Sequence, residues 1–192
     1  MFQNDGTVLP VTILQAGPCV VTQVKSVDKD GYQAVQIGFG AAGKLSKPAT
    51  GHQKASKQEH RHLREVRLDQ SDTELPKVGS ELDVQQFEAV KQVTVSAISK
   101  GKGFAGVIKR HGFHRGPETH GSDHHRKPGS IGGMFPQRVL KGQKLPGHLG
   151  HVRTTVKGLD VVAVDTKNHT LALRGSIPGP KNSIVEIVGN LS

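Results

Sequence analysis

Aromatic residues, cysteine and long apolar runs are scarce in this chain of 192 residues. Aromatic side chains make up 4% of it and there is no Trp, which argues against a protein that recognises single-stranded bases chiefly by stacking. Cys19 is the single cysteine, so an intramolecular disulfide and a cysteine-based zinc site are excluded. No apolar run approaches the roughly 18 residues of a membrane span, and the first residues lack the regions of a secretory signal. We therefore expect a soluble protein that these signals do not export, and a reducing cytosol is compatible with the single cysteine.

Acidic side chains are nearly absent between residues 100 and 157. This segment carries twelve Lys and Arg side chains against only Glu118 and Asp123, so its formal charge of +10 equals that of the entire chain. It also holds half of the 24 glycines and seven of the 11 histidines. A segment this basic repels itself and gains too little from apolar burial to order alone. We predict an extension that takes its shape on a polyanion, and nucleic acid is the obvious candidate.

A second, weaker basic patch spans residues 43–67. Seven Lys and Arg side chains and three histidines stand there against two glutamates. A mixed charge run of this kind is either a solvated helix or loop, or a second nucleic-acid contact. Both interpretations stay open at the level of the sequence.

Short β-like patterns lie on both sides of the basic segment. Apolar residues at two-residue spacing or in brief runs predict strands over 8–14, 20–24, 32–39, 81–87, 90–99, 159–165, 170–174 and 184–188. Gly31 is expected to take a positive φ in a tight turn between the second and third of these. The simplest architecture is mainly β, with residues 1–99 and 158–192 closing one β-barrel and residues 100–157 forming a long basic, glycine-rich inserted extension.

The glycines at the start of the extension allow a nucleotide-binding interpretation. Gly101, Gly103 and Gly106 resemble a phosphate loop in their spacing. No Gly-Lys-Ser/Thr sequence and no βαβ unit follows, so this interpretation is disfavoured. Close approach of glycine backbone and lysine charge to an RNA backbone fits the same residues better.

Histidine spacing in the extension allows a metal interpretation. His111 with His114, and His120 with His124, have spacings that zinc sites use. The adjacent Arg and Lys side chains would repel a cation, and carboxylate support is limited. We expect no metal, no cofactor and no catalytic residue. The alternatives are a metal-dependent nucleic-acid enzyme that uses these histidines and a general RNA-binding architectural protein.

Several strings of residues carry a family resemblance. The extension and its start contain Ser99-Lys-Gly-Lys-Gly-Phe-Ala-Gly, Thr119-His-Gly-Ser, Pro128-Gly-Ser-Ile-Gly and Gly147-His-Leu-Gly. Outside it stand Pro10-Val-Thr, Asp30-Gly-Tyr, Lys47-Pro, Gly51-His, Thr154-Thr-Val and Ile177-Pro-Gly. In this order they resemble the ribosomal protein L3 family, the universal large-subunit proteins, over nearly the whole chain.

The resemblance implies a fold, a function and partners. The fold would be a Greek-key β-barrel of the type shared with translation factors. The protein would be a cytoplasmic structural constituent of the large ribosomal subunit that binds large-subunit rRNA, supports early assembly and sends its extension toward the peptidyl transferase centre. Its partners would be that rRNA and neighbouring large-subunit proteins, with no membrane, no small-molecule substrate and no enzymatic activity. Gly133 stands where bacterial relatives often carry a Gln that is methylated in some of them, so that modification is not expected.

Charge and resemblance together select the candidate site residues. Residues 128–150 are expected to form a loop that is mobile until rRNA fixes it, because prolines and glycines interrupt any long helix or strand. Its tip, expected near the peptidyl transferase centre, is Gly132, Gly133, Met134 and Phe135. The expected rRNA contacts are Lys44, Lys47, His52, Lys54, Arg61, Arg64, Lys100, Lys102, Lys109, Arg110, His111, Arg115, His120, His124, His125, Arg126, Lys127, Ser130, Arg138, Lys141, Lys144, His148, His151 and Arg153.

Overall fold

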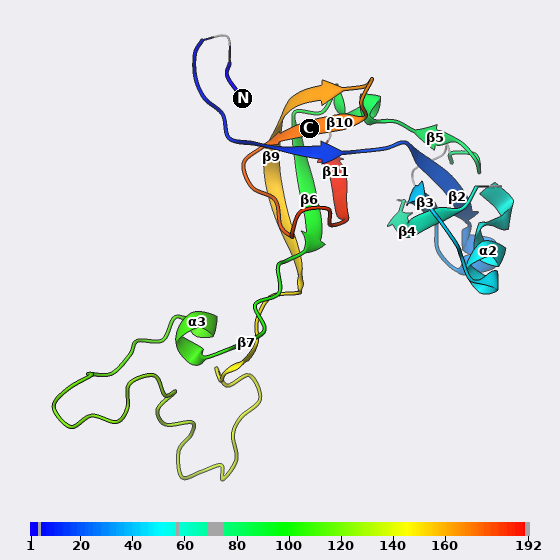
Figure 1. The fold of residues 1–192 in the computed structure, drawn as a ribbon. Helices are drawn as coiled ribbons and strands as arrows, with labels where there is room; N and C mark the ends of the chain where they lie inside the picture. Colours follow the sequence, from blue (N-terminus) through cyan, green and yellow to red (C-terminus); the bar gives the residue numbers. More distant parts are fainter. Residues whose placement is uncertain (4, 57, 69–74, 191–192) are drawn as a thin grey trace. The chain divides into compact units, whose positions relative to one another are not determined.

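Strands dominate the fold, as the sequence predicts. A computed structural model describes residues 1–3, 5–56, 58–68 and 75–190. Its strands form three sheets, and the chain separates into two compact units (Figure 1). One unit holds residues 1–94, 157–176 and those from 187 on, and the other holds residues 95–156 and 177–186. The mainly β class is therefore confirmed.

The largest sheet draws strands from both sides of the basic segment. Its order is β1-β10-β9-β6-β11, and β10 pairs antiparallel with both β1 and β9. Strands β6 and β9, which lead into and out of the basic segment, are neighbours in this sheet. The bounds are β1 Val11–Gln15, β6 Gln92–Ile98, β9 Arg153–Asp165, β10 Thr170–Arg174 and β11 Val185–Asn190.

Alternating burial explains why β6 and β10 are strands. Val93, Val95 and Ala97 are buried at every second position of β6, and Leu171 and Leu173 do the same in β10. Side chains at two-residue spacing point to one face of a strand, so these residues form an apolar face. Burying each of the larger ones contributes roughly 1.5–3 kcal/mol.

A four-stranded antiparallel sheet is built from the first half of the chain alone. Its order is β4-β3-β2-β5. The turn expected between β2 and β3 is present, with Gly31 at a φ of 78°, but the one-turn helix α1 precedes it. The bounds are β2 Cys19–Lys25, α1 Val27–Asp30, β3 Ala34–Ala41, β4 His60–Arg67 and β5 Glu81–Leu82.

The second basic patch contains a strand that the sequence does not reveal. Helix α2 (Lys47–Gln53) and a 3-10 turn, η1 (Lys54–Ser56), precede β4. The Gln53 carboxamide accepts from the His60 N–H at 2.6 Å and donates to the His60 carbonyl at 3.0 Å. Charged side chains dominate β4, so its strand character depends on pairing with β3, which no local pattern shows.

Three further expectations about strands differ from the structure. The strand predicted over 81–87 ends at Leu82, because the Asp83 carboxylate accepts from the Val84 N–H at 2.7 Å and starts the 3-10 turn η2 (Val84–Phe87). Strand β9 begins at Arg153 instead of residue 159. Val8 forms only an isolated bridge with Phe2, so the first strand begins later than predicted.

The predicted closed barrel is not formed by the described strands. The five-stranded order is open and ends at β1 and β11, and the second sheet is open as well. The expectation of one barrel assumed that every strand joins a single sheet, whereas β2 to β5 pair only among themselves. In the described part of the chain no helix is both long and apolar enough to cross a membrane.

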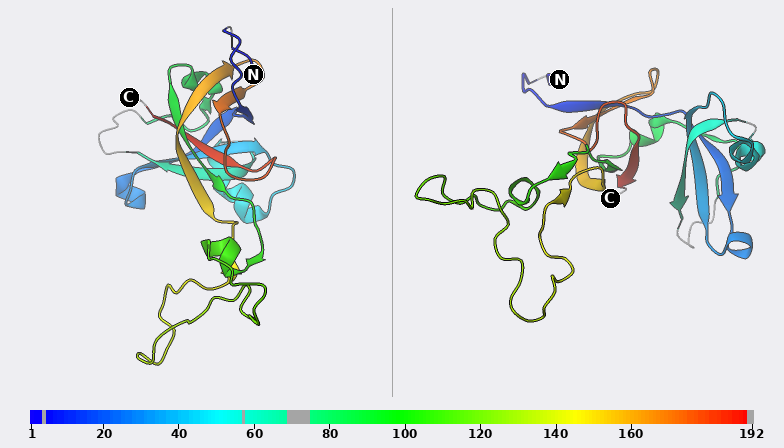
Figure 2. Two further views of the ribbon diagram at one scale, coloured as in Figure 1. Left: turned by 90° about the vertical axis from the view of Figure 1, so that its left-hand side faces the viewer. Right: turned by 60° about the horizontal axis from the view of Figure 1, so that its bottom comes forward.

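The third sheet is a short pair of strands inside the basic segment. Strand β7 (Phe104–Ala105) pairs antiparallel with β8 (Gly147–His148), and helix α3 (Val107–His111) follows β7. Residues 112–146 contain neither a strand nor a helix. Figure 2 shows them as long open loops that begin after α3 and return to β8.

Candidate nucleic-acid interface

Two limbs of the basic segment are joined by main-chain pairing, and we call residues 99–105 and 147–152 the arm base. The Lys102 N–H donates to the Leu149 carbonyl at 2.9 Å, and the Leu149 N–H donates to the Gly103 carbonyl at 3.0 Å. Phe104 then lies opposite His148 in the β7–β8 pair. The arm base therefore brings basic side chains from two distant stretches of sequence together. These side chains, all exposed, are Lys100, Lys102, His148 and His151.

Two glycines permit close approaches within the segment itself. Gly150 has a φ of 75°, and a Cβ there would collide with the carbonyl oxygen of Lys100. A Cβ on Gly116 would likewise collide with the carbonyl oxygen of His124. At these two positions the backbone that the glycines admit is the chain's own, whereas the sequence suggested an approach to RNA at Gly101, Gly103 and Gly106.

Helix α3 is fastened to the returning limb by two residues that were expected to bind rRNA. An Arg110 guanidinium nitrogen donates to the Leu145 carbonyl at 2.6 Å, and Nε2 of His111 lies 3.1 Å from the same oxygen. The guanidinium also lies close against Gly147, where a Cβ would stand 2.9 Å from it. A small apolar centre adjoins this contact, because Ala105 and Val107 are buried.

Residues 115–125 are closed into a loop by polar contacts. Arg115 forms an ion pair with Glu118. Nδ1 of His125 lies 2.9 Å from the Pro117 carbonyl, and the Gly116 N–H donates to the His125 carbonyl at 3.0 Å. His120 and His124 stay exposed on this loop, while His125 is half-buried.

The remaining cations of the segment are exposed. Ser130 donates to the Gly132 carbonyl at 3.1 Å, just before the predicted tip. At that tip Met134 and Phe135 are 81% and 75% exposed. The exposed basic residues are Lys109, Arg126, Lys127, Arg138, Lys141, Lys144 and Lys157.

Arg153 differs from these cations because it has a carboxylate partner. It lies in β9, and two of its guanidinium nitrogens donate to the two carboxylate oxygens of Glu186. The pairing holds the pKa of Arg153 above its usual value. Part of its charge is therefore already neutralised within the protein.

Comparisons with known proteins identify the family of this chain. The family described as ribosomal protein L3 matches residues 66–171. A large ribosomal subunit protein uL3 of Carboxydothermus hydrogenoformans is 49% identical over 190 residues, which cover 97% of this chain and 90% of that protein. The chain belongs to the ribosomal protein L3 family. The proteins of the same name from Pelotomaculum thermopropionicum and Heliobacterium modesticaldum are each 50% identical, over 97% and 100% of this chain and 90% and 91% of theirs.

Membership of the L3 family confirms the resemblance seen in the sequence. The family consists of ribosomal proteins of the large subunit and not of enzymes, so the metal-dependent enzyme is not favoured. Bacterial members work where bacterial ribosomes are, in the cytoplasm, in agreement with the expected location. Within the described part of this L3-family chain, no three His, Cys, Asp or Glu side chains are grouped to hold a metal ion.

The second basic patch of this L3-family chain is divided among several elements. His52 on α2 and Lys54 on η1 line a shallow hollow of about 450 Å³ together with Gln23, Gly51 and Ala55. Arg61 and Arg64 instead lie on β4, which is an edge strand. Lys44 follows β3 and Lys47 begins α2, and both are exposed. The patch is thus a set of exposed cations on a folded scaffold.

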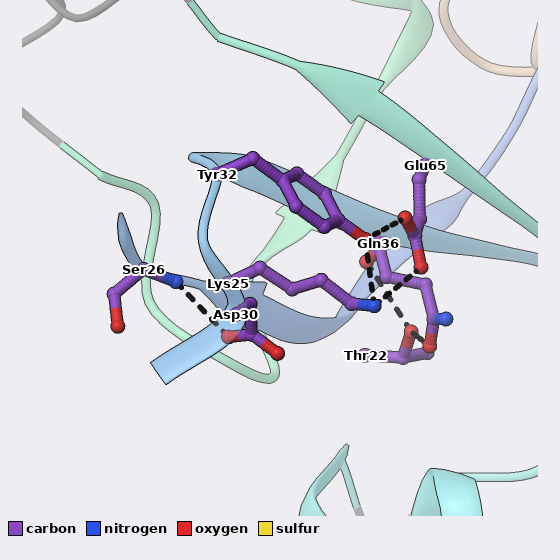
Figure 3. Close-up of polar contacts among 7 residues, drawn as sticks. All are labelled: Thr22, Lys25, Ser26, Asp30, Tyr32, Gln36 and Glu65. Carbon is purple, nitrogen blue, oxygen red and sulfur yellow. Dashed lines mark hydrogen bonds and ion pairs between the residues drawn. The ribbon is translucent and has the colours of Figure 1, made fainter. Parts of the chain in front are cut away.

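A polar network that joins Glu65 of this patch to β2 was not predicted from the sequence (Figure 3). Nζ of Lys25 donates to the Tyr32 hydroxyl at 2.9 Å and forms an ion pair with the Glu65 carboxylate, also at 2.9 Å. The Tyr32 hydroxyl in turn donates to the Glu65 carboxylate at 2.9 Å. Tyr32 and Glu65 raise the pKa of Lys25, while Lys25 and then Tyr32 lower the pKa of Glu65. The Arg67 guanidinium lies 5.1 Å from the centre of the Tyr32 ring. The only available signal was the predicted turn, which places Lys25 and Tyr32 near each other.

Proposed function

We propose that this protein is a structural constituent of the large ribosomal subunit that binds large-subunit rRNA through residues 100–157. The observation that carries the proposal is the arm base, where main-chain pairing gathers Lys100, Lys102, His148 and His151 in a stretch without carboxylates. Phosphate contacts dominate the affinity of such surfaces, and each neutralised phosphate releases counterions. A paired base that presents cations from both limbs suits the backbone of a folded RNA.

We further propose a division of labour along the chain. Residues 1–99 and 158–192 form the β body, and the exposed cations of residues 43–67 add a second rRNA contact. Residues 100–157 form the extension, whose tip at residues 132–135 points toward the peptidyl transferase centre. The protein joins the subunit early in assembly and contacts neighbouring large-subunit proteins.

The candidate rRNA contacts fall into two groups by their surroundings. Exposed cations such as Lys102, Arg126 and Lys144 contact phosphates directly. Arg110 and His111 already meet the Leu145 carbonyl, so they act mainly by shaping the extension, residues 100–157, which we also call the arm and which presents the others. The distances from Arg110 and His111 to the Leu145 carbonyl support the second group. For the exposed cations of the first group, the proposed RNA contacts rest on their exposure and charge.

Competition binding tests the proposed function. A large-subunit rRNA fragment should displace the protein from labelled rRNA far better than tRNA or duplex DNA at near-physiological salt. If roughly 6–10 phosphates are neutralised, the affinity should fall by about 10³- to 10⁵-fold between 50 and 200 mM salt. Equal competition by tRNA would instead indicate a general RNA-binding protein, and metal-dependent cleavage of the RNA would indicate an enzyme.

A charge-removal variant locates the contact surface. Replacing Lys102, Arg126, Arg138 and Lys144 with Ala should reduce the slope of log affinity against log salt by about one unit for each phosphate that is no longer neutralised. The matched control replaces Lys44, Lys47, Lys54 and Arg61, which are also exposed but lie in the second patch. A slope that changed only in the control would place the main contact on residues 43–67.

A further inference from the structure

Phe104 is an exposed aromatic side chain to which the proposed function assigns no role. It is 78% exposed and lies on β7 opposite His148, while the next residue, Ala105, is buried. Successive side chains of a paired strand point to opposite faces, so burial of Ala105 turns Phe104 outward. The ring is therefore presented by paired backbone, and ordering it on a ligand costs little conformational entropy.

The two chain segments that carry Phe104 and its strand partner are basic and contain no carboxylates. Lys100 and Lys102 precede it on the same limb, and exposed His148 and His151 lie on the paired limb. The sequence contains no Asp or Glu from residue 89 to 117 or from 124 to 159. Apolar surface with such a rim suits a partner that offers a flat apolar face together with negative charge.

An unpaired nucleotide has this combination, because its base offers a π face and its phosphates offer charge. We propose that Phe104 stacks on an unpaired rRNA base, and that Lys102 and His148 hold the phosphates on either side of it. The proposal rests on the proposed function and names one contact within it. Scarcity of aromatic residues excludes a platform of many stacked bases, but a single ring on a paired strand needs no repetition.

Substitutions at Phe104 separate stacking from ordinary apolar packing. Phe104→Leu keeps an apolar side chain but removes the π face, so affinity for the rRNA fragment should fall by about 5- to 150-fold. Phe104→Tyr keeps the ring and should bind as the unaltered protein does. The salt slope should stay the same in both variants because no charge changes, whereas Lys102→Ala should lower it by about one unit. Val152→Ala, another exposed apolar position of the arm base, is the control and should have no effect.

Acylation of ribose 2′-hydroxyls then identifies the nucleotide. One unpaired position should be protected by the unaltered protein and exposed in the complex with the Phe104→Leu variant, with the rest of the footprint unchanged. A uniform weakening of the footprint, or equal loss in the Leu and Tyr variants, would mean that Phe104 packs within the protein or on an apolar surface, and would overturn the proposal.

The stacking proposal would also be overturned if Phe104→Leu bound rRNA as tightly as the unaltered protein does. The proposed function would remain intact in that case, provided that rRNA still outcompetes tRNA. Failure of the unaltered protein to prefer rRNA would contradict the proposed function itself, and the stacking with it. The two failures are therefore distinguishable in one set of measurements.

Discussion

The five-stranded sheet and residues 112–146 are held by different physical means. In the sheet, main-chain ladders run beside fully buried side chains such as Val93 and Leu171. Residues 112–146 have few apolar side chains to bury and are constrained at separate points, by the Arg115–Glu118 pair, the His125–Pro117 contact and the Arg110–Leu145 contact. Where charge density prevents an apolar core, local polar contacts set the path of the chain.

The strongest effect that we expect separates these two regions directly. Leu171→Ala should lower the free energy of unfolding by about 2–5 kcal/mol, because it removes a fully buried side chain and leaves a cavity. Met134→Ala, at an exposed position of the arm, should change it by less than about 0.5 kcal/mol. Denaturant unfolding measures both. A comparable loss for Met134→Ala would show that the arm has a core of its own.

The next effect concerns how the arm base is closed. Gly150→Ala should cost about 1–3 kcal/mol locally, because the residue has a positive φ and its Cβ would collide with the Lys100 carbonyl. The limbs should then separate, and trypsin should cleave after Lys100 and Lys102 faster than in the unaltered protein. Gly133→Ala is the control, since its Cβ would meet only the Phe135 carbonyl at 3.7 Å. Equal cleavage rates in the two variants would contradict the close approach.

A smaller effect distinguishes a residue that shapes the arm from one that contacts RNA. Arg110→Ala should cost about 1–2 kcal/mol of local stability by removing the bond to the Leu145 carbonyl. Trypsin should then cut residues 112–146 more readily, with little change in the salt slope of RNA binding. Lys109→Ala, at the exposed neighbouring position, should lower the slope by about one unit and leave cleavage within residues 112–146 unchanged. If Arg110→Ala lowered the salt slope and Lys109→Ala increased cleavage instead, Arg110 would contact RNA and Lys109 would shape the arm.

The weakest effect compares an ion pair between strands with one in the arm. The pKa of Glu65 is lowered from its ordinary value of 4.5, chiefly by Lys25 and then by Tyr32. The ionised carboxylate therefore stabilises the fold at pH values above 4.5. This contribution should be lost as the pH falls below that value and the carboxylate becomes protonated. The unfolding temperatures of the unaltered protein and Glu65→Gln should therefore differ at neutral pH and converge in acid. Glu118→Gln, in the exposed arm pair, should have no effect at either pH.

Strand prediction succeeded where the pattern is local and failed where pairing is distant. The bounds predicted for 170–174 agree with β10, because alternating Leu171 and Leu173 mark the buried face in the sequence itself. Strand β4 was missed because its charged residues carry no such alternation and its partner β3 lies beyond the window of a local pattern. Turn chemistry at Asp83 ended β5 early although the residues after it have apolar spacing.

Three features of this protein could be read from the sequence: the segment that carries the net charge, the mainly β class and the family. Charge adds up along the chain, and family motifs occur in a fixed order. The partners of individual cations could not be read from it, because they depend on how the chain folds in space. Arg110 meets the Leu145 carbonyl and Arg153 meets Glu186, each a group more than thirty residues away. Both arginines were selected as rRNA contacts from charge and family resemblance, and neither charge nor resemblance reveals a partner within the fold. Whether a charge is available to RNA depends on the groups within a few ångströms of it, and those distances are set by folding.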